Sequence, residues 1–460
     1  MLYNIDHFVV LMLENRSFDN LFGKLQGTGV PINGLTGDET NPTGQGGNVR
    51  VWNTPQGPRD GWLPDPDPGE LFSDINAQLG ISPAGAPMSG FAANYAAQEG
   101  QASDIMHYFV PAQLPALSAL ATSYAVCDEW FASAPCQTWP NRFFVHTGTA
   151  GGYENNSPVH FPYLMPTIFN ALDGAAPNGW EIYYHDFPQA LTLSRLWGHL
   201  DRFKPFHEFL EDAQLGHLPS YSFIEPRYFA DLDWPNDMHP PHNINYGDQL
   251  VAQVYNALKS SPNWNSTMLI VLFDEHGGCY DHVLPGKAAA PEAPRRDQVF
   301  KFDRYGVRIP AVIASPWIAP GTVLRAPAGQ TYDHTSVIST LRKRFGIATP
   351  LTARDAAAPD LEAVLNLDQP SDDGRQPVQA LPAPADDTPA ALQDARLAPL
   401  NDFQRALHEA AAHLTPLIHG VAPADHITAL LGGFKPSVPP AASPADALPY
   451  LRNVINKLLP

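Results

Sequence analysis

The sequence predicts a three-layer α/β/α sandwich built around a mostly parallel central sheet. Short apolar segments rich in β-branched residues recur along the chain, and such segments are typical of strands that are buried on both faces. Segments with the apolar spacing of amphipathic helices separate them. Strands that alternate with helices form parallel sheets with helices on both sides, which gives the predicted fold class.

Five segments are predicted to be strands. The strongest is His7–Leu13 (HFVVLML), and Met268–Phe273 (MLIVLF) and Ile309–Ser315 (IPAVIAS) have the same character. Trp180–Tyr184 (WEIYY) and Tyr221–Glu225 (YSFIE) are weaker strand signals. Their lengths suit the strands of a parallel sheet.

Helices are predicted over Asp248–Lys259 and over Thr335–Phe345, which ends at Gly346. Asn401–His413 is a third predicted helix. Pro449–Leu459 is a fourth, with its proline tolerated in the first turn. Segments near 29–100 and 285–305 are rich in Gly, Pro, Asn and Asp and are predicted to be long loops that line a site.

The predicted organisation has three parts. Residues 1–358 form a catalytic domain, and residues 359–400, rich in Pro, Ala and Asp, form a linker. Residues 401–460 form a short helical appendage. A chain of 460 residues is long enough to bury a large core in one such domain.

The composition excludes several classes of protein. A hydrophobic fraction of 44% argues against disorder, and a net charge of -20 argues against nucleic acid as a partner. Three cysteines give no disulfide framework. No apolar run has the roughly 20 residues of a transmembrane segment, and the N-terminus lacks the features of a signal peptide. We therefore expect a cytoplasmic protein, or a secreted one if a leader was removed.

Two pairs of oxygen-bearing side chains directly follow predicted strands. Glu14-Asn15 follows the first strand, and Asp274-Glu275 follows another. Neighbouring residues on a strand point to opposite faces, so both members of a pair reach one point only where the strand gives way to a turn. Ligands of open α/β sheets bind at this edge.

The three carboxylates would repel one another unless a cation held them. Oxygen ligands favour Mg²⁺, Ca²⁺ or Mn²⁺, and Zn²⁺ stays among the candidates. Gly277 and Gly278 would allow a sharp turn beside this site. The alternative is that Glu14 and Asp274 only begin helices, where acidic residues favour the helix dipole. The presence of two such pairs favours one divalent metal ion held by Glu14, Asn15, Asp274 and Glu275.

Thr138 is the candidate nucleophile. It precedes Trp139 and Pro140, a sequence typical of a turn into a helix, and a hydroxyl there is close to anion-stabilising N–H groups. Metal coordination would lower its pKa. Local sequence alone favours a simpler role as an N-cap. Cys136 and Arg142 show the C-x5-R spacing of cysteine-dependent phosphatases, but the residues between them are too large for a phosphate-wrapping loop, and Cys136 is better explained as an apolar filler.

Phosphoryl transfer also needs a group that gives a proton to the leaving oxygen. Imidazole suits this role near neutral pH. His239 and His334 stand out among the 17 histidines because both lie at loop-to-helix junctions with acidic neighbours. His282 follows Asp281 after the glycine pair and is a further candidate.

Four motifs together resemble the bacterial phosphoesterase family, which contains phosphatidylcholine-hydrolysing phospholipases C and acid phosphatases of the A type. The resemblance runs from about residue 5 to 346, over HFVVLMLENRSFDNLFG, TWPNR, NDMHPP and LFDEHGGCYDHV. It implies an alkaline-phosphatase-like core. It also implies a metal bound by the two pairs and by a Ser or Thr nucleophile, and two active-site histidines. Carried onto this chain, these residues are Glu14, Asn15, Thr138, Asp274, Glu275, His239 and His334.

The chain departs from the family pattern at two places. Cys136-Gln137 stands where members often have Gly-Pro before the nucleophile. Glu70 stands where many members have a histidine in a D-P-G-H-x-F segment, which puts the phosphate contact or leaving-group protonation in doubt. Glu70, Asn141 of the T-x-P-N segment and His282 are the candidate substrate-binding residues.

The sequence thus predicts a metal-dependent phosphoester hydrolase of phospholipase C type that acts through a phosphothreonine intermediate. The alternatives are an acid phosphatase for phosphomonoesters and a non-catalytic protein that binds phosphoesters. The expected partner is a small phosphoester or a phospholipid headgroup, with transient contact to a membrane surface. Trp62, Trp130, Trp139 and Trp234 are candidates to stack on a choline headgroup, although ordinary core or loop packing is the favoured explanation for them.

Overall fold

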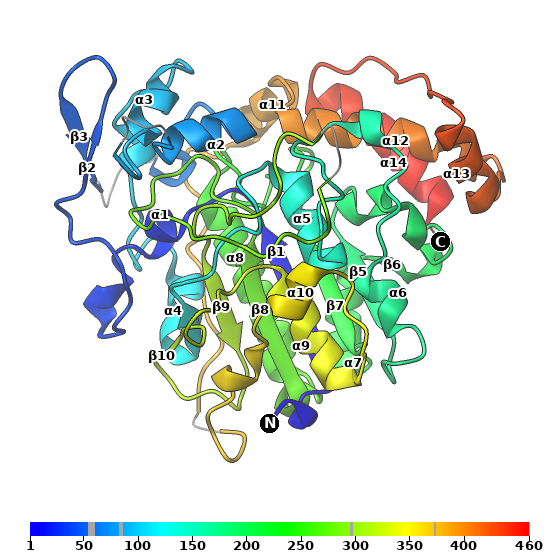
Figure 1. The fold of residues 1–460 in the computed structure, drawn as a ribbon, viewed down its shortest axis with the longest axis horizontal. Helices are drawn as coiled ribbons and strands as arrows, with labels where there is room; N and C mark the ends of the chain where they lie inside the picture. Colours follow the sequence, from blue (N-terminus) through cyan, green and yellow to red (C-terminus); the bar gives the residue numbers. More distant parts are fainter. Residues whose placement is uncertain (54–59, 82–85, 295–297, 372–373, 460) are drawn as a thin grey trace.

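An eight-stranded sheet runs through the centre of the molecule (Figure 1). The structure, a computed structural model, describes residues 1–53, 60–81, 86–294, 298–371 and 374–459. The strand order is β10-β4-β9-β8-β1-β7-β5-β6, and a separate hairpin pairs β2 with β3. The strands are β1 His7–Leu13, β2 Thr40–Pro42, β3 Asn48–Arg50, β4 Ala125–Cys127, β5 Trp180–Tyr184, β6 Phe203–Pro205, β7 Tyr221–Glu225, β8 Thr267–Phe273, β9 Ala311–Ala314 and β10 Thr322–Leu324.

The central strands confirm the predicted mostly parallel sheet. β1, β5 and β7 have the predicted bounds, and β8 begins one residue earlier than predicted. β1 pairs in parallel with both β7 and β8, and every residue of β1 and β8 is buried. β9 is shorter than the predicted strand and runs antiparallel to β4 and β8. The sequence did not predict this direction, because an apolar run of residues does not encode it.

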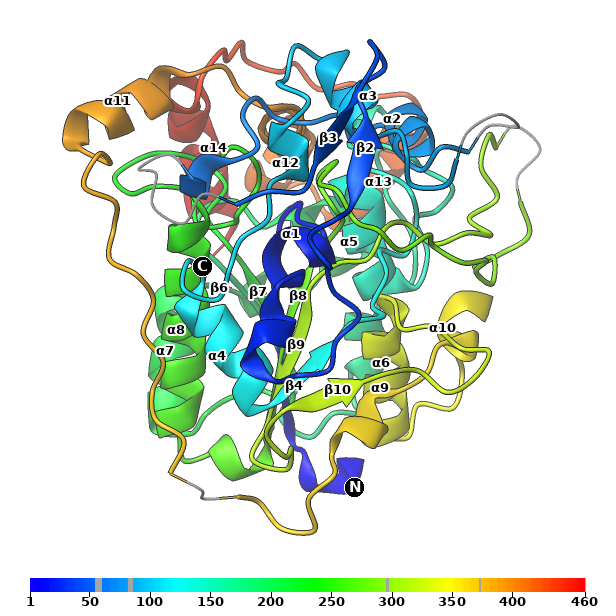
Figure 2. The same ribbon diagram turned by 90° about the vertical axis from the view of Figure 1, so that its left-hand side faces the viewer.

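Helices cover both faces of the sheet (Figure 2). One layer holds α4, α7 and α8, and the other holds α5, α6 and α9, which confirms the three-layer sandwich. Their bounds are α1 Phe18–Phe22, α2 Phe72–Gln78, α3 Phe91–Ala96, α4 Pro115–Ser123, α5 Thr138–Thr147, α6 Ile168–Leu172, α7 Phe206–Leu215, α8 Ile244–Ser260, α9 Thr335–Phe345, α10 Ala353–Ala357, α11 Pro389–Leu397, α12 Asp402–Ile418, α13 Pro423–Leu431 and α14 Pro444–Leu458.

Two predictions of local structure were wrong. The segment 29–100 is not one long loop, because it contains the β2–β3 hairpin, α2 and α3. The last helix begins at Pro444 rather than at Pro449, since Ser443 and Asp446 form a capping box five residues earlier than expected. Parts of the predicted loops (54–59, 82–85 and 295–297) and of the predicted linker (372–373) lie outside the described residues.

The C-terminal helices α12, α13 and α14 lie over the edge of the sheet where β1 ends (Figure 1). Phe403 of α12 is buried and packs edge-to-face against Tyr228, with ring centroids 4.8 Å apart. The side chain of Gln404 donates to the carbonyl oxygen of Tyr228 at 2.6 Å. His413 stacks on Phe161 at 4.4 Å. Residues 401–459 therefore contain three helices, whose buried apolar side chains belong to the same hydrophobic core as the sheet.

The segment predicted as a linker follows the outside of the molecule. The backbone of Val378 exchanges two hydrogen bonds of 2.9 Å with the side chain of Asn256 on α8. The short helix α11 then leads to α12. Among the described helices, none is both long enough and apolar enough to cross a membrane.

Candidate active site

The two acidic pairs meet at the carboxyl ends of neighbouring strands. Leu13 and Phe273, the last residues of β1 and β8, are register partners, so Glu14 and Asp274 leave the sheet side by side. The backbone N–H of Asn15 donates to Asp274 Oδ1 at 2.8 Å. All four side chains of Glu14, Asn15, Asp274 and Glu275 are fully buried.

The chain turns sharply after each strand, as the pairs require. Asn15 adopts a left-handed conformation with φ of 57°, and Gly277 and Gly278 have φ of 58° and 64°. A Cβ atom on Gly277 would lie 2.1 Å from the backbone oxygen of Asn15. Only glycine fits at this point, because the two turns touch through their backbones.

Thr138 lies beside the first pair. Its Oγ1 is 3.3 Å from Glu14 Oε2 and 3.4 Å from Asn15 Oδ1, and the residue is fully buried. Thr138 is the first residue of α5, and the N-cap position belongs to Gln137. The simpler N-cap explanation of Thr138 was therefore wrong.

Asn141 supports the loop that carries Thr138. Its side chain accepts from the N–H of Ala134 at 3.0 Å and donates to the carbonyl oxygen of Cys136 at 2.8 Å. It is fully buried in these contacts. These contacts tie this predicted substrate-binding residue to the backbone of the loop that precedes Thr138.

Arg142 holds Glu14 in place, one turn after Thr138 along α5. Its guanidinium donates two hydrogen bonds to Glu14 Oε1 and one to the carbonyl oxygen of Met12 at 3.0 Å. It also lies 3.8 Å from Glu225, the last residue of β7. Burial raises the pKa of the Cys136 thiol well above its ordinary value. The C-x5-R segment is therefore no cysteine phosphatase loop, because its arginine is committed to carboxylates and its cysteine is a thiol.

The buried oxygens of this cluster fit a divalent cation. Asp274 Oδ2 and Glu275 Oε1 are buried and make no hydrogen bond to any described residue. Burial raises the pKa values of Glu14, Asp274 and Glu275, and the charge of Asp274 raises those of its two neighbours further. Unpartnered buried carboxylate oxygens are costly unless a cation satisfies them. The donor set of Glu14, Asn15, Thr138, Asp274 and Glu275 is all oxygen, which suits a hard divalent ion.

Both predicted histidines border the cluster. His334 Nε2 donates to the carbonyl oxygen of Asp274 at 2.5 Å, which leaves its buried Nδ1 without a hydrogen bond to a described residue. His239 Nδ1 donates to the carbonyl oxygen of Pro240 at 2.7 Å. Burial lowers the pKa of each histidine to about 4. Both imidazoles are therefore neutral near pH 7 in the protein without substrate.

Glu70 also lies at the site. Its Oε1 accepts a hydrogen bond from the side-chain amide of Asn15, and only 7% of the residue is exposed. Burial raises the pKa of Glu70 well above its ordinary value, and the charges of Glu275 and Asp67 add to this shift. The structure brings Glu70 to the acidic cluster.

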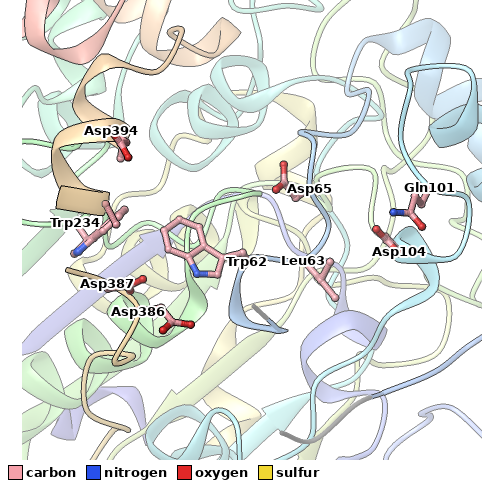
Figure 3. A pocket seen from close by; sticks show the side chains of 11 residues that line it. Trp62, Leu63, Asp65, Gln101, Asp104, Trp234, Asp386, Asp387 and Asp394 are labelled. Atoms are coloured by element: carbon pink, nitrogen blue, oxygen red, sulfur yellow. The ribbon is translucent and has the colours of Figure 1, made fainter. Parts of the chain in front are cut away.

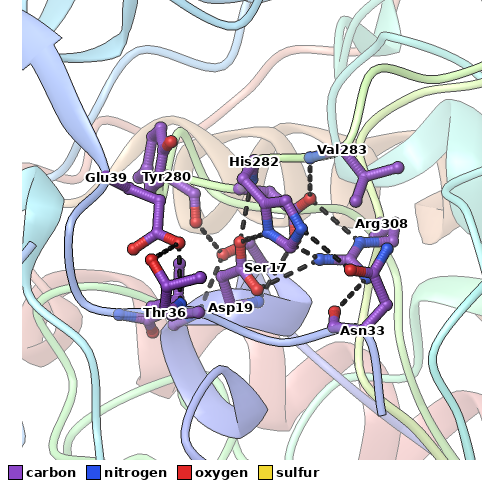
Figure 4. Close-up of polar contacts among 12 residues, drawn as sticks. Ser17, Asp19, Asn33, Thr36, Glu39, Tyr280, His282, Val283 and Arg308 are labelled. Atoms are coloured by element: carbon purple, nitrogen blue, oxygen red, sulfur yellow. Dashed lines mark hydrogen bonds and ion pairs between the residues drawn. The ribbon is translucent and has the colours of Figure 1, made fainter.

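His282 belongs to a separate network (Figure 4). Its Nδ1 is 2.6 Å from Asp19 Oδ2, and Arg308 donates to Asp19 Oδ1 at 3.0 Å and to Asp281 Oδ1 at 2.9 Å. Burial lowers the pKa of His282, but the hydrogen bond with Asp19 and the charges of Asp19 and Asp281 together outweigh this effect, so the net shift is upward. The buried guanidinium of Arg308 supplies the positive charge between these acids. The structure therefore does not bring His282 to the Thr138 cluster.

An open cavity of about 610 Å³ is lined in part by Leu63 and Asp65, which precede Glu70 in the sequence (Figure 3). Trp62 and Trp234 form part of its wall, with ring centroids 5.1 Å apart in an edge-to-face arrangement. The carbonyl oxygen of Leu63 accepts from Arg16, which directly follows the Glu14-Asn15 pair. The acidic residues of its lining are Asp65, Asp104, Asp386, Asp387 and Asp394.

Sequence reasoning missed several residues of the site. Arg142 lies in the TWPNR motif, but nothing local identifies Glu14 as its partner. Asp237 lies in the NDMHPP motif, and its carbonyl oxygen accepts from the N–H of Glu14 at 2.8 Å. Asp67 lies three residues before Glu70, in a segment where the family pattern was already recognised.

The match to a known protein family covers the residues of this site. The Phosphoesterase family model matches residues 5–348. Non-specific phospholipase C1 of Arabidopsis thaliana is 40% identical over 398 residues, which cover 80% of this chain and 72% of that protein. Non-specific phospholipase C3 of the same plant is 37% identical over 442 residues, or 89% of this chain and 82% of that protein. Non-hemolytic phospholipase C of Burkholderia pseudomallei (strain K96243) is 28% identical over 446 residues, or 81% of this chain and 60% of that protein.

Among solved structures, a protein in the alkaline phosphatase superfamily from Vibrio parahaemolyticus aligns with a TM-score of 0.32 and 12% identity. The alignment covers 74% of this chain and 77% of that one. The family match and the phospholipase C relatives identify the chain as a hydrolase of phosphoester bonds. The chain belongs to the phosphoesterase family.

Proposed function

We propose that the protein is a metal-dependent hydrolase of phospholipase C type that acts through a phosphothreonine intermediate. The observation that carries this proposal is the position of Thr138. Its hydroxyl lies at the amino end of α5, within 3.4 Å of oxygens from both members of the Glu14-Asn15 pair. A hydroxyl held at a helix N-terminus among buried acidic groups suits attack on an anionic phosphoester.

The side chains around Thr138 have separate roles in a two-step displacement. Thr138 Oγ1 attacks phosphorus as its hydroxyl proton passes to His239 or His334, and the amino end of α5 stabilises negative charge on the phosphoryl oxygens. Glu14, Asn15, Asp274 and Glu275 would hold a divalent cation, which would lower the pKa of the hydroxyl. The approaching phosphate raises the pKa of the imidazole that takes the proton, and this imidazole then gives the proton to the leaving oxygen as the bond between that oxygen and phosphorus breaks. Water then releases the phosphoryl group from Thr138.

Replacement of the nucleophile tests the reaction directly. We expect Thr138→Ala to lower kcat by several orders of magnitude and Thr138→Ser to retain activity, because serine also offers a hydroxyl. Thr147→Ala is the matched control, since Thr147 is a buried threonine on the same helix whose hydroxyl donates to backbone oxygens. Acid quenching and mass spectrometry should locate a phosphoryl group on the peptide that contains Thr138. Near-normal turnover by Thr138→Ala contradicts the mechanism.

The acidic aromatic cavity favours a substrate with a cationic headgroup over a simple phosphomonoester. Trp62 and Trp234 offer aromatic faces, and the five aspartates of the lining favour positive charge. Leu232, two residues from Trp234, is 81% exposed and suits transient contact with lipid. We infer a phospholipid with a quaternary ammonium headgroup as the preferred class of substrate.

Two chromogenic substrates separate this reading from the acid phosphatase alternative. We expect higher kcat/KM for p-nitrophenyl phosphorylcholine than for p-nitrophenyl phosphate, and we expect Trp234→Ala to raise KM for the first only. The opposite preference favours the phosphomonoesterase. Binding of choline phosphate without turnover of either substrate, with several metals, favours the non-catalytic alternative.

A further inference from the structure

A second open cavity, of about 860 Å³, lies beside α2 and shares no described lining residue with the cavity of Figure 3. Phe72 and Asn76 of α2 line it together with residues of the segments 285–288 and 300–304. The rings of Phe72 and Phe300 are 4.9 Å apart, and the guanidinium of Arg304 donates to Asn76 Oδ1 at 2.5 Å. The helix α2 and the chain that follows β8 therefore form one continuous surface.

Large apolar side chains are exposed around this cavity. Ile81 lines it, and Leu71, Leu284 and Val299 each directly precede a residue that does. Their exposed fractions lie between 47% and 82%. A single exposed apolar residue is ordinary, but a group of them around one cavity marks a surface that contacts lipid or another protein.

The charge of this surface is opposite to that of the whole chain, whose net charge is -20. Among the described residues of the lining, Lys287 and Arg304 face the single carboxylate of Asp303, and Lys301 is exposed between two phenylalanines. The described lining of the cavity in Figure 3 instead has five aspartates and no lysine or arginine. Basic side chains around exposed apolar ones suit a bilayer that contains anionic lipid.

One short segment connects both cavities with the Thr138 cluster. Trp62 lines the acidic cavity, Glu70 accepts a hydrogen bond from Asn15 of the cluster, and Phe72 lines the basic cavity. In Figure 1, α2 lies over the edge of the sheet where β1 ends. A phospholipid carries its headgroup on one side of the phosphoester and its acyl chains on the other. The acidic cavity suits a cationic headgroup, which leaves the apolar and basic surface for the acyl side.

We propose that this surface, called here the Phe72 surface, docks on a lipid bilayer that contains anionic phospholipids. Its apolar side chains insert among the lipid headgroups, and its basic side chains lie near the lipid phosphates. A second copy of the chain fits less well, because two such surfaces would bring like charges together. The inference rests on the proposed function, since it adds the surface through which a phospholipid substrate enters. The residues of the Phe72 surface are Leu71, Phe72, Ile81, Leu284, Lys287, Val299, Lys301 and Arg304.

Vesicle binding tests the Phe72 surface without turnover. Thr138→Ala protein, which lacks the proposed nucleophile, is sedimented with vesicles of phosphatidylcholine alone or mixed with phosphatidylglycerol. We expect tighter binding to the mixed vesicles. Leu284→Glu and Val299→Glu, each added to this protein, should weaken binding to them at least tenfold, because a carboxylate replaces an inserted apolar group. The double change Lys287→Glu, Lys301→Glu should abolish the preference for the mixed vesicles.

Leu215→Glu is the matched control for Leu284→Glu. Leu215 is 62% exposed at the end of α7, shortly before β7 begins, so it lies at the opposite edge of the sheet. Its replacement should leave vesicle binding unchanged, and circular dichroism confirms that each variant is folded. Equal weakening by Leu215→Glu overturns the proposal, as does absence of binding to either kind of vesicle. A dimer that Val299→Glu dissociates, in protein that binds no vesicles, also overturns it.

Turnover separates this proposal from the proposed function. With Thr138 intact, Leu284→Glu should lower hydrolysis of phosphatidylcholine in mixed vesicles at least tenfold. It should leave kcat/KM for p-nitrophenyl phosphorylcholine unchanged, because that substrate is dissolved singly in water. Wild-type protein that binds vesicles but hydrolyses neither substrate contradicts the proposed function alone. Equal hydrolysis of vesicle lipid by the wild type, Leu284→Glu and Val299→Glu contradicts the Phe72 surface alone.

Discussion

Removal of Arg142 should destabilise the protein far more than removal of any surface arginine. Arg142 is fully buried, and so are its two carboxylate partners, Glu14 and Glu225. Breaking a buried ion pair by deleting one partner costs about 3–5 kcal/mol, because the remaining charge stays buried without compensation. Total stabilities of folded proteins are about 5–15 kcal/mol. Arg142→Met keeps the length of the side chain but removes the charge and all donated hydrogen bonds, so we expect the free energy of unfolding to fall by about 3–5 kcal/mol.

Urea unfolding of chelated protein at pH 7.5 measures this loss. Arg50→Met is the matched control, since Arg50 and its partner Asp38 are 62% and 83% exposed and such pairs contribute at most about 1 kcal/mol. The double variant Glu14→Gln, Arg142→Met should regain part of the loss, because one buried charge disappears with its partner. A loss below about 1 kcal/mol in Arg142→Met, or no recovery in the double variant, refutes the reasoning.

Three further predictions concern pH, metal and the C-terminal helices. Burial lowers the pKa of His146, whose ring nitrogens make no hydrogen bond to described residues. Below about pH 6.5 this histidine is therefore protonated in the unfolded chain but stays neutral in the folded protein. The free energy of unfolding consequently falls as the pH drops below about 6.5. The stabilising effect of His146→Phe should therefore grow by about 2 kcal/mol between pH 8 and pH 5, measured by urea unfolding at both values, and parallel curves contradict this. Chelation with EDTA should abolish turnover and lower Tm, and Mn²⁺ at 100 times its Kd should return about 2.7 kcal/mol of stability; an unchanged melting curve argues against a bound metal. Phe403→Ala should lower the free energy of unfolding, measured in urea, by about 3–5 kcal/mol and should also lower kcat. The reason is that Phe403 packs on Tyr228, whose ring centroid lies 5.5 Å from the Arg142 guanidinium. Unchanged stability contradicts a core shared between the C-terminal helices and the sheet.

The sequence was informative where local pattern decides structure. The strands β1, β5 and β7 have their predicted ends, since short apolar runs of this kind have few other stable arrangements. The antiparallel direction of β9 depends on which strands it meets, and no local pattern reports that. The helices α2 and α3 lie in a segment rich in turn residues, and they form because tertiary packing buries Ile75 and Phe91.

Some residues of the site could likewise be predicted from local sequence, and others could not. The two acidic pairs were identifiable because each directly follows a strand, and neighbouring parallel strands end at one edge. Their partners were not, because Arg142 and Asp67 reach the acidic residues only through tertiary contacts. His282 and Asn141 were predicted as substrate-binding residues from their residue types. The sequence did not reveal their spatial partners, which are Asp19 for His282 and the backbone of Cys136 for Asn141.

The contact between Gly277 and the backbone of Asn15 fixes how closely the two loops of the acidic site approach each other. The two loops cannot move closer together, because the space that a Cβ would need is already occupied by the oxygen of Asn15. The hydrogen bond from Asn15 to Asp274 also opposes their separation. An ion with longer oxygen distances, such as Ca²⁺ at about 2.3–2.6 Å against about 2.1 Å for Mg²⁺, would therefore have to be accommodated by rotation of the carboxylates. Because Arg142 holds Glu14 in place, the carboxylate of Glu275, whose Oε1 makes no hydrogen bond to a described residue, would make most of this adjustment.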